Sequence, residues 1–281
     1  MRIEITDWMP FRATARRETY AIGDVHGQDD HLAALHDAIA ASIEERRTAG
    51  APDALLVHLG DYIDRGPKSL QVLQRAHRGP GIAGIEKVDL MGNHEQFLRL
   101  ALDGDDPVDL INTLNLWLNN GGVSACASFG VDCSRALANP LAFQAALHAA
   151  LGPDVVGYLR SLRMYHREER MLFVHAGINP RLPLDAFLAT PWDMVPSHYR
   201  DEARSPLWIR ESFLHWEAPN PEDVYVVHGH SPLRDDDDWA LTGMPECRPH
   251  RLNLDTGCFQ TGRLTAAHFS GSEFRLIFAV G

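Results

Sequence analysis

Short apolar runs recur along this chain, and each is followed directly by a polar block that contains glycine. The runs cover Thr19–Ile22, Ala54–Leu59, Val88–Met91, Met171–Val174 and Val224–Val227. Short apolar runs bounded by turn-forming residues are typical of buried strands. Loops at strand ends are where a rigid sheet holds functional side chains. We therefore predict a sheet whose strand ends carry the chemistry of the protein.

Between the first two runs the apolar spacing becomes helical. The residues that recur at three- and four-residue steps are Leu32, Leu35, His36, Ile39 and Ile43. This spacing predicts one buried face of a helix, and Asp29 or Asp30 could cap its start. Strand, helix and strand in this order predict a parallel βαβ unit, in which successive strands end at the same edge.

Residues 96–160 differ in composition from the preceding part of the chain. They are rich in Leu and Ala, have helical spacing in places and contain the break Asn119–Gly122. We predict that they form a helical insertion packed beside the strand edge. Because no clean linker interrupts the sequence, we expect residues 1–281 to form a single domain with this insertion.

The strand-like runs after residue 171 lack long helices between them. They include 252–254, 264–269 and 274–280. This pattern predicts a second, more antiparallel sheet. Residues 1–17 look like a lead-in, with three arginines near its end. Residues 180–222 form a connection rich in Pro, Trp and charge, and a connection of this length is usually functional or mobile.

Bulk composition excludes several classes of protein. The 281 residues are 45% hydrophobic and 23% charged, which is ordinary for a globular protein with a substantial core. The formal net charge of −12 argues against a nucleic-acid-binding surface. No apolar run reaches the ~20 residues needed to cross a membrane, and no secretory signal is evident. The four cysteines lack CxxC pairing, so we expect reduced thiols in a cytoplasmic protein.

The five polar blocks each place an Asp, Asn or His beside a Gly. They are Gly23–Gly27, Gly60–Gly66, Gly92–Glu95, His175–Gly177 and His228–His230. One such block is more often a turn than a metal site. Five blocks at strand ends of one chain predict a shared site. Their oxygen and nitrogen atoms suit borderline divalent metals such as manganese, iron and zinc.

Six residues of these blocks form the predicted metal-ligand set: Asp24, His26, Asp61, Asn93, His175 and His230. Asp61 is our choice for the carboxylate that bridges two ions. Asp24 and His26 complete the first ion, and the other three residues complete the second. His228 stays open as a ligand, a residue behind the ligands or part of the core. A water held between two such ions would attack phosphorus in line.

A second group of residues is predicted to contact the phosphate: Arg65, Arg210, Asn93 and His94. A planar guanidinium can bind two phosphate oxygens as a fork, and this suits the two arginines. Simpler roles compete with this one. Arg210 could stack on Trp208 or pair with Glu211, and Arg65 could form a surface ion pair with Asp64.

His94 is the predicted general acid of the reaction. It stands next to the expected ligand Asn93, where it could give a proton to the leaving oxygen. Asp64 could orient its imidazole, as carboxylates commonly do for working histidines. We therefore assign His94, Asp64, Arg65 and Arg210 to catalysis.

Together these blocks resemble the PPP-type, calcineurin-like metallophosphoesterases, especially the bacterial and phage serine/threonine protein phosphatases. The family signature reads GDxHG, GDxxDRG, GNHE, a strand-end histidine and GH[ST], and all its parts occur here in order. Further likeness lies in Trp117–Gly122, Leu207–Glu211 and Leu254–Gly257. The resemblance spans about residues 19–270.

The resemblance implies an α/β (α+β) fold, a β-sandwich of two mixed sheets flanked by helices, with a dimetal site at the strand ends. It implies the ligand roles assigned above and pairs His94 with Asp64. It also favours His230 over His228, because the ligand of the family precedes Ser or Thr and Ser231 follows His230.

The implied function is metal-dependent phosphoester hydrolysis with two divalent ions, Mn2+ first and Fe or Zn as alternatives. The leading hypothesis is a serine/threonine protein phosphatase, acting on a phosphoprotein or a small phosphoester. The alternative is a dinucleoside polyphosphate (diadenosine tetraphosphate) hydrolase, for which the basic residues Arg160, Arg163, Arg167 and Arg170 could be relevant. A non-catalytic metal-binding module is disfavoured because Arg65, His94 and Arg210 are all retained. The oligomeric state stays open.

Overall fold

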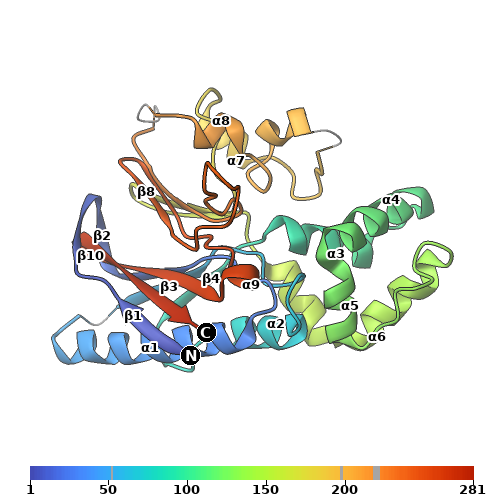
Figure 1. Ribbon diagram of the computed structural model, residues 1–281, viewed down its shortest axis with the longest axis horizontal. Coiled ribbons are helices and arrows are strands. Elements are labelled where there is room, and N and C mark those ends of the chain that lie inside the picture. Colours follow the sequence, from blue (N-terminus) through green and yellow to red (C-terminus); the bar gives the residue numbers. More distant parts are fainter. Residues whose placement is uncertain (52, 197–198, 218–221) are drawn as a thin grey trace.

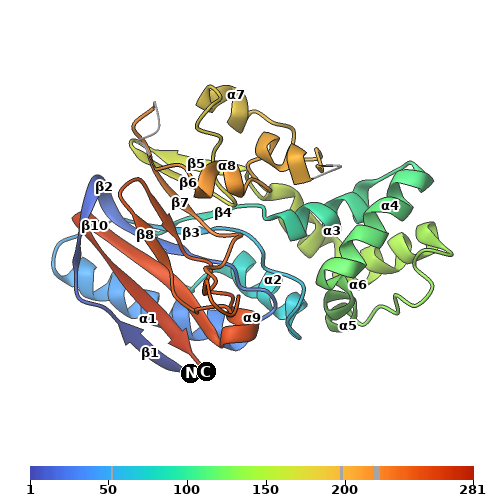
Figure 2. The ribbon, with the colours of Figure 1, turned by 45° about the horizontal axis from the view of Figure 1, so that its top comes forward.

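Two five-stranded sheets lie at the centre of the structure, and helices flank them (Figures 1 and 2). The computed structural model describes residues 1–51, 53–196, 199–217 and 222–281. The first sheet has the order β1 (Arg2–Ile5), β10 (Arg263–Val280), β2 (Met9–Ile22), β3 (Ala54–His58) and β4 (Glu86–Asp89). The second has the order β5 (Tyr165–Glu168), β6 (Met171–Val174), β7 (Tyr225–His228), β9 (Arg251–Asn253) and β8 (Glu246–Arg248).

Both sheets are mixed to the same degree. In the first, β2, β3 and β4 run parallel, while β1, β10 and β2 pair antiparallel. In the second, β6, β7 and β9 run parallel, and β5 and β8 pair antiparallel at the two edges. The prediction of a more antiparallel second sheet was therefore wrong. The parallel strands in each sheet bring their carboxyl ends to one edge.

The C-terminal strand corrects a second expectation. The runs 264–269 and 274–280 are one bent strand, β10, which pairs with β1 and β2 in the first sheet and not in the second. The pairing with β2 shifts register on both sides of Gly271, whose φ is 57°. A bulge of this kind bends a strand, and its exposed residues resemble a turn in the sequence.

The N-terminal residues also have regular structure where the sequence indicated a lead-in. Residues 2–5 form β1, and most of the remaining residues begin β2. Along β2 the inward positions hold Phe11, Ala13 and Ala15, which alternate with exposed side chains. Alanine is depleted in strands in general, so these small inward residues gave a weak strand signal.

The core between the sheets contains side chains from both. The buried residues include Leu55, Val57 and Phe269 of the first sheet with Phe173, Val227 and Leu252 of the second. The rings of Phe11 and Tyr225 meet edge to face with centroids 4.8 Å apart. Two sheets packed over a shared apolar layer form a β-sandwich. The predicted architecture of two mixed sheets flanked by helices is confirmed.

The helix expected after the first strand is α1 (Asp29–Thr48), which buries the predicted apolar positions. Neither aspartate caps this helix, because both lie inside it. The N-cap residue is Gln28, whose side chain makes no capping hydrogen bond. Asp29 lies in the first turn and binds Arg75 of α2 (Ser69–Arg78), with Nε 2.6 Å from Oδ1. Both helices pack beside the first sheet (Figure 1).

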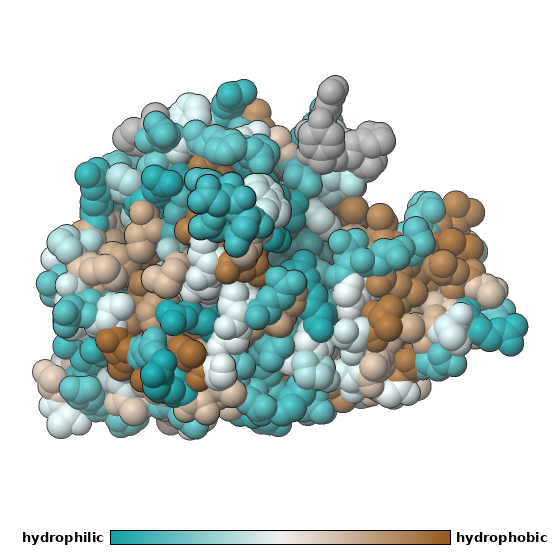
Figure 3. Space-filling model, viewed as in Figure 1, coloured by the Kyte–Doolittle hydropathy of each residue, from teal (hydrophilic) through white to brown (hydrophobic). Residues whose placement is uncertain are grey.

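A helical lobe, residues 93–161, extends to one side of the sandwich (Figure 2). It consists of α3 (Asn93–Asp103), α4 (Pro107–Trp117), the π-helical turn η1 (Leu118–Gly122), α5 (Val123–Phe129) and α6 (Pro140–Ser161). Its surface exposes apolar side chains, which gather over the lobe in Figure 3 and include Val108, Ile111, Leu116 and Val123.

Short helices complete the described part of the chain. They are α7 (Leu184–Leu188), η2 (Tyr199–Arg204), α8 (Glu211–Leu214) and α9 (Cys258–Thr261). The first three lie in the connection, residues 180–222, and the last follows β9. Among the residues described here, none of the helices is both long enough and apolar enough to cross a membrane.

Candidate metal centre

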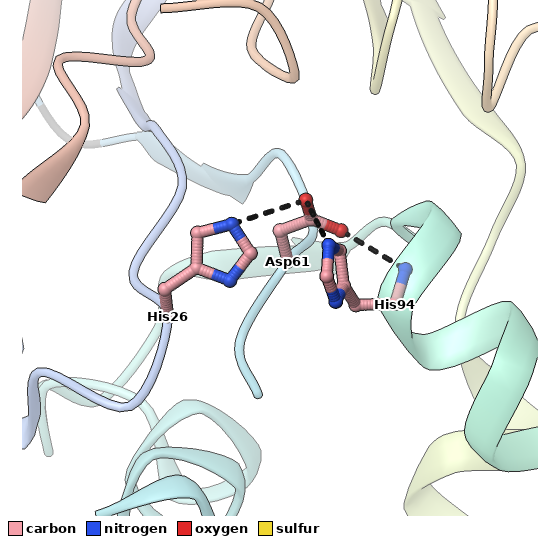
Figure 4. Close-up of side chains that lie close together, drawn as sticks. All are labelled: His26, Asp61 and His94. Atoms are coloured by element: carbon pink, nitrogen blue, oxygen red, sulfur yellow. Dashed lines mark hydrogen bonds and ion pairs between the residues drawn. The ribbon is translucent and has the colours of Figure 1, made fainter. Parts of the chain in front are cut away.

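All six predicted ligands lie together at the edge where the parallel strands end. Five of them lie in the loops that follow β2, β3, β6 and β7, and Asn93 is the first residue of α3, which follows β4. Every one is at most 7% exposed: Asp24, His26, Asp61, Asn93, His175 and His230. The fold thus gathers polar side chains from five distant segments into one buried cluster. Figure 4 shows part of this cluster, with His26 and His94 on either side of Asp61.

Asp61 lies at the middle of the cluster, and its two oxygens face different histidines. Its Oδ2 is 3.4 Å from Nε2 of His26, and its Oδ1 is 3.4 Å from Nε2 of His175. A carboxylate placed in this way can serve two ions at once. The position therefore suits the bridging role predicted for Asp61.

The other half of the cluster converges on the side-chain oxygen of Asn93. This Oδ1 lies 3.0 Å from Nε2 of His175 and 2.8 Å from Nδ1 of His230. Three atoms that commonly ligate metals therefore point to one small volume. Asp61, His175 and His230 together form a group that could hold an ion.

Backbone carbonyls fix which ring nitrogens face the cluster. Nδ1 of His26 donates to the carbonyl of Ile63 at 2.8 Å, and Nδ1 of His175 donates to that of Leu59 at 2.9 Å. Each Nε2 is then unprotonated and directed inward, as histidine ligands require. Within the described residues, Nε2 of His26 and Oδ1 of Asp24 are buried without a hydrogen-bond partner. These orphaned atoms fit a site built for divalent cations.

The charges of the buried carboxylates also favour bound cations at this site. Burial raises the pKa of Asp24 well above its usual range, and the neighbouring carboxylates of Asp255 and Asp61 raise it further. Buried negative groups this close together are unfavourable unless cations offset them. Asp255 is 2% exposed and accepts the Gly257 N–H at 2.9 Å. No role was predicted for Asp255 from the sequence, although it stands in the segment Leu254–Gly257, which resembles the family.

His94 makes the contact predicted for the general acid. Its Nδ1 is 2.6 Å from Oδ2 of Asp64, and its Nε2 faces the cluster, 3.2 Å from Nη2 of Arg65. Burial alone would lower the pKa of His94, but the charge of Asp61 and the bond to Asp64 outweigh burial and raise it.

Geometry alone would also admit His94 as a ligand, because it forms a possible metal-binding group with His26 and Asp61. One contact favours the acid role: the cationic Arg65 adjoins Nε2 of His94, which disfavours a metal ion there.

Trp117 is a residue of this site that sequence reasoning missed. Its indole N–H lies 3.0 Å from each oxygen of Asp64. It comes from α4 in the helical lobe, so the lobe helps to orient the acid pair. The Trp117–Gly122 segment gave a signal, but nothing in it indicated a contact with Asp64. Asp64 is fully buried, which excludes a surface ion pair with Arg65.

The two arginines have different neighbours in the site. The Arg65 guanidinium lies next to His94 and over the Phe259 ring, 4.8 Å from its centroid. Arg210 binds Glu202, with Nη1 3.0 Å from Oε1. Burial lowers the pKa of His230 well below its usual range, and the charge of Arg210 adds to this effect, so Arg210 is close enough to act on His230 through its charge.

The simpler roles considered for Arg210 do not fit the contacts of the described residues. Glu211 pairs instead with His215, at 3.0 Å. The indole of Trp208 donates to Gln96, and its ring packs against Phe97. Glu202, the actual partner of Arg210, lies eight residues upstream and had no sequence signal.

His228 lies apart from the ligand cluster. Its Nδ1 is 3.0 Å from the carbonyl of Gly229, and its ring meets Phe213 edge to face, with centroids 5.0 Å apart. The backbone N–H of His230 donates to Oδ2 of Asp24 at 2.9 Å, which ties the last block to the first. Of the two histidines, the structure therefore brings only His230 to the other predicted ligands.

Glu95 organises the backbone beneath the cluster. Its carboxylate accepts four backbone N–H groups, from Asp61, Tyr62 and Ile63 at 2.8, 2.8 and 3.2 Å and from Gly92 at 3.0 Å. One buried carboxylate thus joins the loop that carries Asp61 to the loop that carries Asn93. No role was predicted for Glu95 from the sequence beyond its place in the motif.

Comparisons with known proteins agree with this geometry. The family model for calcineurin-like phosphoesterases matches residues 18–239. The chain is 28% identical to a symmetrical bis(5'-nucleosyl)-tetraphosphatase of Janthinobacterium sp. (strain Marseille), over 90% of this chain and 93% of that protein. It is 25% identical to an asymmetrical bis(5'-nucleosyl)-tetraphosphatase of Halalkalibacterium halodurans, over 90% of each.

Among solved structures, a cold-active protein tyrosine phosphatase has a similar fold. The TM-score is 0.52 at 19% identity, and the match covers 92% of this chain and 78% of that one. At this identity the likeness concerns the fold alone.

We expect the protein to bind two Mn2+ ions per chain, because two sets of donors share Asp61. His230→Ala should retain about one ion, since it removes a donor of the second set only, whereas Asp61→Asn should weaken both sites. Elemental analysis after loading and desalting measures this. His228→Ala is the matched control and should keep both ions. If His228→Ala lost metal and His230→Ala kept it, then His228 and not His230 would be the ligand.

Glu95→Gln should lower the free energy of unfolding by at least about 2 kcal/mol, because the amide presents one acceptor oxygen to four buried donors. It should also weaken Mn2+ binding, since the Asp61 loop loses its anchor. Urea unfolding and metal titration measure the two effects. Glu44→Gln, in which an exposed glutamate is changed, should alter neither. Equal stability of the two variants would show that Glu95 does not hold the loops.

Proposed function

This chain belongs to the calcineurin-like phosphoesterase family, and we propose that it hydrolyses dinucleoside polyphosphates. Membership of the family, with its buried Asp and His cluster, makes it a dimetal phosphoesterase; the proposal concerns the substrate. The observation that carries it is the similarity to two bis(5'-nucleosyl)-tetraphosphatases along nearly the full length of all three chains. This favours the alternative weighed in the sequence over the serine/threonine protein phosphatase.

The charges of the site support a substrate with several phosphates. Arg65 lies next to His94, and the charge of Arg210 acts on His230, so a polyphosphate chain could contact both arginines while one phosphorus is attacked. A forked guanidinium binds two oxygens of one phosphate at once. By contrast, two of the four arginines of the basic segment, residues 160–170, are engaged elsewhere. Arg160 pairs with Asp103, and Arg170 pairs with Asp223.

Two divalent ions, held by the six predicted ligands, would screen the phosphate charge and activate the attacking water. We propose Mn2+ as the ion, because the donors are oxygen and nitrogen atoms without a thiolate. Arg65, Arg210 and the Asn93 side chain would orient the phosphate. His94, held by Asp64, would give its proton to the leaving oxygen.

A substrate panel tests the proposal directly. Metal-loaded protein should hydrolyse diadenosine tetraphosphate with a kcat/KM at least about tenfold above that for phosphoserine or phosphothreonine peptides, a difference of roughly 1.4 kcal/mol in transition-state binding. Chromatography of the products distinguishes two nucleoside diphosphates from a mono- and a triphosphate. A preference for phosphopeptides would restore the protein phosphatase hypothesis.

His94→Asn should lower kcat by roughly 10²–10⁴ on a phosphoserine peptide, whose leaving alkoxide needs a proton. The loss should be smaller on diadenosine tetraphosphate and p-nitrophenyl phosphate, because their leaving groups depart as stable anions. Steady-state kinetics on the three substrates measure this gradient. His215→Asn is the control, since His215 is exposed and pairs with Glu211, which is not a predicted ligand. Equal losses on all three substrates would remove the acid role.

A further inference from the structure

Gln96 lies on α3, one turn after Asn93, and is fully buried. The hydrogen-bond partners of its side chain all lie outside this helix. Its Oε1 accepts the indole N–H of Trp208 at 2.6 Å. Its Nε2 donates to the carbonyls of Trp192 and Met194, at 2.5 and 3.1 Å. An indole nitrogen can only donate and a carbonyl can only accept, so the orientation of the amide is determined by its partners.

These bonds attach two parts of the connection, residues 180–222, to the helix that begins with Asn93. One part is the segment 192–194. The other is the arginine loop, residues 205–210, which ends at Arg210. The Trp208 ring packs against Phe97 of α3, with centroids 5.3 Å apart, and lies 6.1 Å from the ring of His230. Gln96 is thus a direct link between the helix of the metal centre and the loop of the second arginine.

The arginine loop has a second attachment on its other side. The carbonyl of Pro206 accepts the backbone N–H of Ala176, next to His175, at 3.0 Å. Within the loop, the N–H groups of Trp208 and Ile209 both reach the carbonyl of Ser205. The loop is therefore a compact turn, held on one side by Ala176 and on the other by Gln96 and Phe97, which both contact Trp208.

We propose that Gln96 is a positioning residue, which holds the arginine loop so that the guanidinium of Arg210 faces the phosphate bound at the second ion. This inference rests on the proposed function of the site as a phosphoesterase. Gln96 itself touches no substrate and acts through Trp208. The physical reason is precision: a displacement of about 1 Å in a positioning group can cost a factor of 10² in rate. Glu202 competes with the phosphate for the guanidinium of Arg210. The direction in which this guanidinium points therefore depends on the position of the loop that carries it.

The alternative is that Gln96 only satisfies buried polar groups of the connection. Losing it would then destabilise the fold without a specific effect on Arg210. Gln144 offers a matched comparison, because its Nε2 also donates to two backbone carbonyls, those of Ala101 and Gly104, at 3.0 and 2.9 Å. These contacts lie within the helical lobe and involve neither the connection nor Arg210.

A double-mutant cycle separates the two roles. Gln96→Met preserves most of the side-chain volume and removes the hydrogen bonds. We expect it to lower kcat/KM tenfold or more, with unchanged Mn2+ content and a raised inhibition constant for inorganic phosphate. In an Arg210→Ala background the same change should cost less than about twofold, because residues that act through one another are not additive. Gln144→Met should leave kcat/KM within about twofold in both backgrounds.

Trp208→Phe is the second test, because it removes the indole N–H from the other end of the contact. It should reproduce the loss seen in Gln96→Met and should also be non-additive with Arg210→Ala. Additive losses in either cycle, or full activity of Gln96→Met, would overturn the proposal. All cycles are run with p-nitrophenyl phosphate as well as diadenosine tetraphosphate. Failure to hydrolyse the tetraphosphate would refute the proposed substrate. The coupling between Gln96 and Arg210 could still be measured with p-nitrophenyl phosphate.

Discussion

The buried carboxylate of Glu95 is the constraint on which the metal centre depends. It binds four backbone N–H groups of two loops, and these loops supply Asp61 and Asn93. The loops approach so closely that glycine is needed at the contact. A Cβ on Gly92 would lie 2.1 Å from Oδ1 of Asp61, and a Cβ on Gly60 would lie 2.5 Å from the backbone nitrogen of Gly92. The glycines of the motif therefore permit the approach that Glu95 stabilises.

The electrostatic cost of the site follows from this close approach. Asp24, Asp61 and Asp255 are buried together, and the charge of Asp61 opposes the ionisation of Asp24 and Asp255. Burial raises the pKa of Asp255 to about 6, and the charge of Asp61 adds to the effect of burial. Backbone amides offset part of this cost, since His230 N–H binds Asp24 and Gly257 N–H binds Asp255. Divalent cations, which the orphaned atoms of Asp24 and His26 fit, would offset the remainder.

Two tryptophans connect the outlying segments to the chemistry. Trp117 comes from the helical lobe and donates to Asp64, which holds His94. Trp208 comes from the connection and donates to Gln96, one residue after Glu95. In each case an indole N–H, which can only donate, binds a buried oxygen and thereby fixes the direction of the contact. The lobe and the connection thus do more than cover the sandwich, because each positions a residue at its edge.

The sequence by itself determined which side chains stand at the ends of the parallel strands, because apolar runs and the glycines after them are local features. That was enough to predict two sheets, the helix α1 and the cluster of six candidate ligands, whereas the sandwich was implied by the resemblance of the motifs to a known family. It did not predict β10 as one strand, because a bulge at Gly271 made this strand resemble two. It also did not predict the first half of β2, because inward alanines weakened the apolar pattern.

Only the tertiary structure decided the contacts that join distant segments. It placed Trp117 against Asp64, Glu202 against Arg210 and Glu95 beneath the Asp61 loop. It also separated His228, which packs on Phe213, from His230, which faces Asn93, although the two are neighbours in sequence. The physical reason is that a hydrogen bond between buried groups depends on how whole elements pack, and local periodicity reports only which face of its own element a residue occupies.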